Sequence, residues 1–145
     1  MTGVVRLGKV LSRQDQLVER LTKFALDCAN LLKSLSLTEQ NKIYGKQLIR
    51  SSSSIGANYV EATVASSKKE FSNCVNIARR EAKESLYWLD LLRKVSNSTD
   101  FVDLVDESEQ ILRILSAMVK TSKLEYFYLV KPFYILHLTL YISIV

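Results

Sequence analysis

Hydrophobic residues recur at steps of three and four along most of the chain, which is the spacing of one face of an α-helix. A first amphipathic helix is predicted from Gln14 to Ser36, and a second follows from Thr38, a suitable N-cap, to about Ala65. The first apolar stripe is Leu17, Leu21, Phe24, Cys28, Leu31, Leu32 and Leu35, and the second is Tyr44, Leu48, Ile55, Tyr59 and Ala62.

Two further helices complete the pattern. Ser67 and Glu70 match the capping box, in which an N-cap serine is followed three residues later by a glutamate, and the third helix runs from there to about Val95. A polar loop at residues 96–100 precedes a fourth helix, which we expect to end near Lys123. The apolar positions are Phe71, Val75, Ala78, Ala82, Leu86, Leu89 and Leu92 in the third helix, and Leu104, Val105, Ile111, Leu112, Leu115, Met118 and Val119 in the fourth. The predicted fold is an all-α, antiparallel up-and-down four-helix bundle.

The two ends of the chain differ from the predicted bundle at residues 14–123. Residues 1–13 are a basic N-terminal arm that lacks the apolar run of a signal peptide. Residues 124–145 are an apolar tail, rich in aromatic and β-branched residues and without helical periodicity. The uninterrupted apolar part of the tail begins after Pro132 and is too short to span a bilayer, so we expect no membrane partner and keep a tail anchor as the lesser alternative. The tail is expected to pack on the bundle, to pair between subunits, or to be a non-native extension of the reading frame.

Composition supports one helical domain in a reducing compartment. The chain has 145 residues, 48% of them hydrophobic, with only 4 Gly and 1 Pro, which disfavours a fold of many short strands. The two cysteines, Cys28 and Cys74, lie far apart and lack metal-ligand spacing, so free thiols in a cytoplasmic protein are expected. The net charge of +5 is concentrated in the first half of the chain, which fits either contact with nucleic acid or a lysine-rich solvated surface.

A polar stripe in the second helix stands beside its apolar face. Its members, at steps of three and four, are Gln47, Arg50, Ser54, Asn58 and Glu61. We interpret it first as a polar packing network inside the bundle or at a subunit contact; contact with a ligand or nucleic acid, and a catalytic role, are the alternatives. The adjoining residues 51–54 are all serine and Gly56 follows, although glycine costs about 1 kcal/mol relative to alanine within a helix. Close approach of a neighbouring helix explains such small residues.

Candidate phosphate contacts are Arg50 in the second helix and Arg79, Arg80 and Lys83 in the third. Acidic residues alternate with the basic ones in the third helix, so a solvated face with local ion pairs is the other interpretation. Trp88 is interpreted as an aromatic anchor in the core or at an interface rather than as a platform for base stacking.

The sequence predicts no enzyme, no metal and no cofactor. The single histidine, His137, lies in the tail, so the bundle offers no histidine base for a serine or cysteine nucleophile. Glycine-rich phosphate loops, HExxH and the Glu-x-x-His motif of di-iron bundles are all missing from the sequence.

Three ordered segments resemble a known family. They are LIRSSSSIGANYVEA at residues 48–62, SSKKEF at residues 66–71 and EAKESLYWLDLL at residues 81–92. The family pattern is an arginine and small residues, then Ser-Ile-x-Ala-Asn-x-x-Glu, then a Ser-Lys-x-(Glu/Asp)-Phe helix start. Over residues 14–123 the chain resembles the bacterial four-helix bundle proteins encoded by intervening sequences of 23S rRNA genes, whose members usually end near the position of Lys123.

The resemblance implies a bundle that assembles into homo-oligomers, typically a pentameric ring. It also implies kinship with the accessory variability protein of diversity-generating retroelements, a basic pentamer that works with a reverse transcriptase and nucleic acid. Our hypothesis is therefore a non-enzymatic oligomeric scaffold that binds RNA or DNA backbone. The alternative is a protein–protein adaptor, for example for a reverse transcriptase or polymerase. An enzyme using Asn58 or Glu61 is the third and least supported hypothesis.

Overall fold

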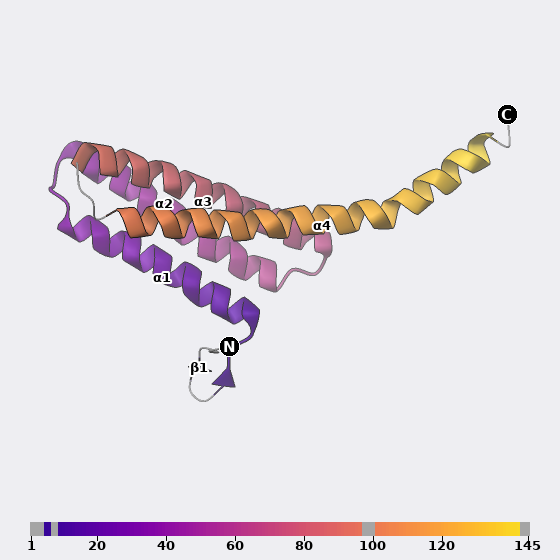
Figure 1. Cartoon of the computed structure of the whole chain (residues 1–145), viewed down its shortest axis with the longest axis horizontal. Coiled ribbons are helices and arrows are strands. Elements are labelled where there is room, and N and C mark those ends of the chain that lie inside the picture. The colour runs from indigo at the N-terminus through magenta and orange to yellow at the C-terminus, as the bar shows by residue number, and fades with distance from the viewer. Residues whose placement is uncertain (1–4, 7–8, 97–100, 143–145) are drawn as a thin grey trace.

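The computed structural model describes residues 5–6, 9–96 and 101–142, and it describes side chains for residues 11–96 and 101–122. A short antiparallel pair, β1 (Val5–Arg6) and β2 (Lys9–Val10), precedes the helices. The helices are α1 (Arg13–Ser34), α2 (Glu39–Thr63), α3 (Lys68–Ser96) and α4 (Val102–Ile142). Figure 1 shows them as an up-and-down bundle, so the predicted all-α fold is confirmed.

Each helix packs on its neighbours in the chain, and α4 closes the bundle against α1. The buried core draws on all four helices because each contributes one apolar stripe at helical spacing. The predicted stripes supply most of the core, which consists of Leu17, Leu21, Phe24, Cys28, Leu48, Ile55, Tyr59, Ala62, Val75, Ala78, Ala82, Leu89, Leu92, Phe101, Leu104, Ile111, Leu115 and Val119.

Side-chain caps fix where the helices begin. Thr38 Oγ1 accepts a hydrogen bond from the backbone N–H of Asn41, which confirms it as the N-cap of α2. Ser67 Oγ accepts from the N–H of Glu70, as predicted, but the Glu70 carboxylate accepts chiefly from the N–H and hydroxyl of Ser66. These two bonds from Ser66 lower the pKa of Glu70.

The start of α1 is set by a capping box that was not predicted from the sequence. Ser12 Oγ accepts from the N–H of Asp15 at 3.1 Å, and the Asp15 carboxylate accepts from the N–H of Ser12 at 3.2 Å. The helix therefore begins at Arg13, one residue earlier than predicted. The pattern was present as Ser-x-x-Asp, with aspartate in place of the usual glutamate or glutamine at the third position.

Small residues let α2 approach two neighbours, as the serine-rich stretch predicted. Toward α3, Ser85 Oγ donates to Ser51 Oγ at 2.8 Å, and both side chains are fully buried. Toward α1, a Cβ added to Gly45 would lie 3.1 Å from a methyl carbon of Leu32, which is tighter than ordinary van der Waals contact. A larger side chain at Ser51 or Ser85 would strain the α2–α3 contact, and one at Gly45 would require Leu32 to shift by a few tenths of an ångström.

An ion pair joins α1 to α4. The Arg20 guanidinium makes a two-pronged ion pair with Glu107, with Nε–Oε1 at 2.6 Å and Nη2–Oε2 at 2.8 Å, and also donates to Gln110 Oε1 at 2.8 Å. Bidentate pairs of this kind fix orientation as well as distance. Arg20 therefore sets how α4 lies against α1.

The expected end of the fourth helix near Lys123 is wrong, because α4 continues through Pro132 to Ile142. A segment that is apolar at nearly every position shows no amphipathic period even when it is helical, and this explains the error. Residues 97–100 of the predicted polar loop, and residues 143–145, lie outside the described residues. In the part of the chain that the structure describes, no helix is both long and apolar enough to cross a membrane.

We expect Ser51→Leu to destabilise the bundle by about 1–3 kcal/mol, because extra methylenes in a filled helix interface force strain. Chemical denaturation followed by circular dichroism measures this effect. Ser53→Leu is the matched control: Ser53 is exposed on the same helix, so its free energy of unfolding should hardly change. Equal destabilisation by both variants would contradict a close α2–α3 contact at Ser51.

The buried thiol of Cys28 should resist alkylation. Burial is the main cause that raises its pKa, to about 12, so the reactive thiolate is scarce at neutral pH. Mass spectrometry of the native chain after iodoacetamide at pH 8 should show at most one adduct, on the half-buried Cys74. Two adducts should appear in guanidinium chloride. Native labelling of Cys28 at the rate seen in denaturant would show that α1 is not packed as described.

Candidate functional site

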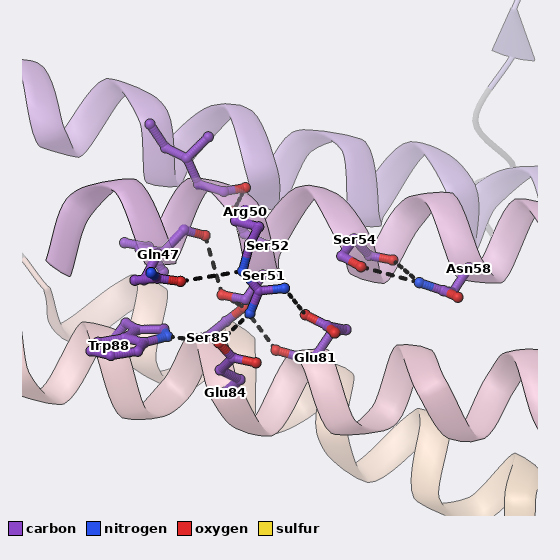
Figure 2. Close-up of polar contacts among 12 residues, drawn as sticks. Gln47, Arg50, Ser51, Ser52, Ser54, Asn58, Glu81, Glu84, Ser85 and Trp88 are labelled. Carbon is purple, nitrogen blue, oxygen red and sulfur yellow. Dashed lines mark hydrogen bonds and ion pairs between the residues drawn. The ribbon is translucent and has the colours of Figure 1, made fainter. Parts of the chain in front are cut away.

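A polar cluster joins α2 to α3 around Arg50, and Figure 2 shows its members pointing toward one another. Arg50 Nε donates to Gln47 Oε1 at 3.2 Å. Across the interface, Arg50 Nη2 donates to Glu84 Oε1, and Nη1 lies 3.5 Å from Glu81 Oε2. One guanidinium thus holds two carboxylates that lie one turn apart on α3. We call Gln47, Arg50, Glu81, Glu84 and Trp88 the Arg50 cluster.

Trp88 is the aromatic part of this cluster. Its indole N–H donates to Glu84 Oε1 at 3.1 Å, and its ring stacks on Tyr44 of α2 with centroids 5.9 Å apart. Tyr87 approaches the same ring edge-on, with centroids 5.0 Å apart. The half-buried Trp88 therefore contacts both α2 and α3, as an anchor would; its predicted place at a subunit interface stays a prediction.

The charges of the cluster shift the pKa values of its members in opposite directions. The hydrogen bond from Arg50 is the largest cause that lowers the pKa of Glu84, and the bond from Trp88 comes second. The same contact with Glu84 raises the pKa of Arg50. Both groups are therefore charged throughout the physiological range.

The rest of the predicted polar stripe does not join this cluster. Asn58 Nδ2 donates to the backbone oxygen of Ser54 at 2.8 Å and to Ser54 Oγ at 3.1 Å, so this pair lies within α2 (Figure 2). Glu61 is exposed. The stripe thus divides into an inter-helix contact at Gln47 and Arg50, a local pair at Ser54 and Asn58, and a solvated carboxylate.

The other three predicted basic residues share a recess of about 510 Å³ on α3. Its lining is Ile77, Arg79, Arg80, Glu81, Lys83 and Glu84. Arg79 is half-buried and donates to Asn76 Oδ1 at 3.0 and 3.1 Å, whereas Arg80 and Lys83 are exposed one turn apart. No ion pair of Arg80 or Lys83 occurs in the described part of the chain.

The Arg50 cluster determines the charge of this recess. Both carboxylates that line it, Glu81 and Glu84, are engaged by Arg50 from α2, so the three remaining charges of the lining are positive. From the sequence, Glu81 and Glu84 are only two of the acidic residues that alternate with basic ones in α3. Glu81, Glu84 and Trp88 follow one another at steps of three and four, and this spacing was the sequence signal that the three side chains share one face of α3.

Among the described residues, no group of three histidine, cysteine, aspartate or glutamate side chains is placed to hold a metal ion.

The comparisons with known proteins agree with this architecture. A family model described as "23S rRNA-intervening sequence protein" matches residues 13–117. A crystal structure of a protein of unknown function from the S23 ribosomal protein family of Bacteroides thetaiotaomicron is 35% identical, with a TM-score of 0.65. That match covers 72% of this chain and 98% of the other. None of the curated proteins compared with the chain matches it.

The protein is a four-helix bundle that carries the three family-like segments at residues 48–62, 66–71 and 81–92. The chain belongs to the 23S rRNA-intervening sequence protein family. The resemblance to this family is thereby confirmed, whereas the kinship with the accessory variability protein stays a prediction.

Arg50→Ala should destabilise the bundle at pH 7, because it leaves two neighbouring carboxylates without their cation. The effect should depend on pH: the folded state lowers the pKa of Glu84, so its stabilisation is full above the unfolded value of about 4.3 and is lost as pH falls through the folded value. Urea unfolding at pH 7 and at pH 3.5 measures the difference in free energy of unfolding between Arg50→Ala and the unsubstituted protein, which should be smaller at pH 3.5. Arg113→Ala, which removes an exposed pair with Glu109, is the control and should change little. A pH-independent difference for Arg50→Ala would contradict the ion-pair account.

Proposed function

We propose that the chain is a non-enzymatic oligomeric scaffold that binds the phosphate backbone of RNA or DNA through the recess on α3. The observation that carries this proposal is the division of charge around α3. Arg50 engages Glu81 and Glu84 on the α2 side, and the unpaired Arg80 and Lys83 face solvent. Exposed cations without carboxylate partners are the groups that displace counterions from a polyphosphate chain.

The roles of the four predicted basic residues differ within this proposal. Arg80 and Lys83 contact phosphate directly. Arg79, which Asn76 holds in place, adds a guanidinium suited to two-pronged contact. Arg50 acts indirectly, because it neutralises the two carboxylates that would otherwise repel phosphate.

Such a surface positions a nucleic acid without reading its sequence. Arg79, Arg80 and Lys83 lie within two turns of one straight helix, which suits a backbone that runs past α3. The family name associates these proteins with 23S rRNA intervening sequences, and RNA is accordingly the first nucleic acid to test.

Self-association is the second part of the proposal. A single recess with three cations binds a polyphosphate weakly, whereas several copies held in one oligomer bind one strand at several points and gain avidity. The resemblance implies a homo-oligomer, and a pentamer is the assembly we propose.

A protein–protein adaptor remains the alternative proposal because apolar side chains are also exposed on α3. Ile77 and Tyr87 both face solvent, and Tyr87 rests on Trp88, which gives a protein partner a rigid aromatic surface. A partner such as a polymerase or reverse transcriptase should then stay bound after nuclease treatment, and Tyr87→Ala should release it.

The combined variant Arg79→Ala, Arg80→Ala, Lys83→Ala should weaken RNA binding and lower the magnitude of the slope of log K against log salt by about 2–3. Fluorescence anisotropy with a labelled single-stranded RNA, repeated from 50 to 300 mM salt, measures both quantities. The matched control, Arg13→Ala, Lys33→Ala, Lys120→Ala, removes the same charge from exposed positions on other helices. If both variants lose affinity equally, only net charge matters; if neither does, the recess does not bind RNA.

A further inference from the structure

An apolar groove lies between α1 and α2 at the turn that joins them. It has a volume of about 340 Å³ and is lined by Leu32, Leu35, Ser36, Leu37, Asn41, Lys42, Gly45, Lys46 and Ile49. The side-chain oxygen of Asn41 is buried at the groove and has no hydrogen-bond partner among the described residues. Four of the nine lining residues are leucine or isoleucine, two are lysines, and Asn41 supplies the unused acceptor.

Exposed apolar side chains continue this groove along α2. Gly45 and Gly56 both face α1, since an added Cβ on them would meet Leu32 and Leu21. Ile49 and Val60 each lie one turn beyond one of these glycines, which places them beside α1. Their exposed fractions are 44% and 45%. We call the groove together with Ile49 and Val60 the α1–α2 seam.

The second apolar feature is the C-terminal part of α4, residues 124–142, which we call the arm. Figure 1 shows α4 running past the ends of the other helices, so the arm projects from the bundle. Its sequence, LEYFYLVKPFYILHLTLYI, is apolar at most positions. A helix of such residues is stable only when its apolar side chains are buried, and an exposed one promotes association.

We propose that the arm of one chain packs along the α1–α2 seam of a second copy. This inference rests on the self-association in the proposed function and names the surfaces that mediate it. At 1.5 Å per residue the arm is about 28 Å long, close to the roughly 30 Å of α2 from residue 41 to residue 60, over which the seam extends. The seam is exposed at Ile49 and Val60, the arm is apolar in sequence, and the two have similar lengths.

The arm reaches the seam of another copy more readily than its own. The groove lies at the α1–α2 turn, whereas α4 leaves the bundle at the opposite end and points away from that turn (Figure 1). Packing on its own seam would require α4 to break and reverse. An arm-to-seam contact joins two different surfaces, so it is heterologous and repeats from copy to copy until a ring closes.

Disulfide trapping between two full-length chains tests the contact directly. One chain carries Val60→Cys and a mass tag, the other carries a cysteine in the arm, scanned from Leu129→Cys to Leu136→Cys, and both carry Cys74→Ser. Cys28 stays, because it is buried. After co-expression and mild oxidation, we expect a mixed dimer that contains both masses. Val95→Cys, exposed to 47% on α3, replaces Val60→Cys as the control and should give no mixed dimer.

Each other outcome overturns the inference. Dimers of two Val60→Cys chains would show seam-to-seam pairing, and dimers of two arm-cysteine chains would show that the arms pair with each other. If no cross-link forms and the full chain floats with phosphatidylcholine vesicles, the arm belongs in a membrane. If native mass spectrometry shows an oligomer but no mixed dimer forms, self-association stands and the arm-to-seam contact is wrong. If it shows only a monomer, both self-association and the arm-to-seam contact are wrong.

A charge placed in the seam gives an independent measurement. Val60→Glu should shift the full-length protein toward smaller species in native mass spectrometry and light scattering, because it puts a carboxylate against the apolar arm. Val95→Glu has nearly the same starting exposure on another helix and should leave the mass distribution unchanged. Equal shifts in both variants, or none in Val60→Glu, would contradict the proposal.

Discussion

The close approach of α2 to α3 is the constraint on which much of this structure depends. Ser51 and Ser85 meet hydroxyl to hydroxyl in the core, and this contact leaves no room for larger side chains. At that separation Arg50 can span the interface and hold carboxylates on the neighbouring helix. The packing of small residues and the placing of charge are therefore two results of the same helix-to-helix distance.

Charge placement then connects the core to the surface. Arg50 neutralises Glu81 and Glu84, the carboxylates of α3 that face α2. Arg80 and Lys83, on the solvent side of α3, have no ion pair among the described residues. A change inside the α2–α3 interface would consequently alter the electrostatics of an outer face that it does not touch. The rotation of α3 about its own axis determines which of its side chains pack against α2. It therefore also determines which cations face solvent at the proposed binding surface.

The sequence predicted elements that depend on local pattern. The N-caps at Thr38 and Ser67, the four apolar stripes and the need for small residues in α2 all follow from spacing within one helix. The pairing of Arg50 with Glu84 and Glu81 could not be predicted in this way. These partners lie 34 and 31 positions away, and the pairing depends on the register between two helices. The length of α4 was missed because a segment that is apolar all round carries no period.

The Arg20–Glu107 pair has a consequence for how the chain folds. Every other helix contact joins elements that are neighbours in the sequence, whereas this pair is separated by 87 positions. Closing so long a loop is entropically slower than forming helical hairpins, so we expect α2 and α3 to associate before α4 meets α1. We expect this α1–α4 contact to form last in the cell, and it is therefore where two nascent chains are most able to exchange helices.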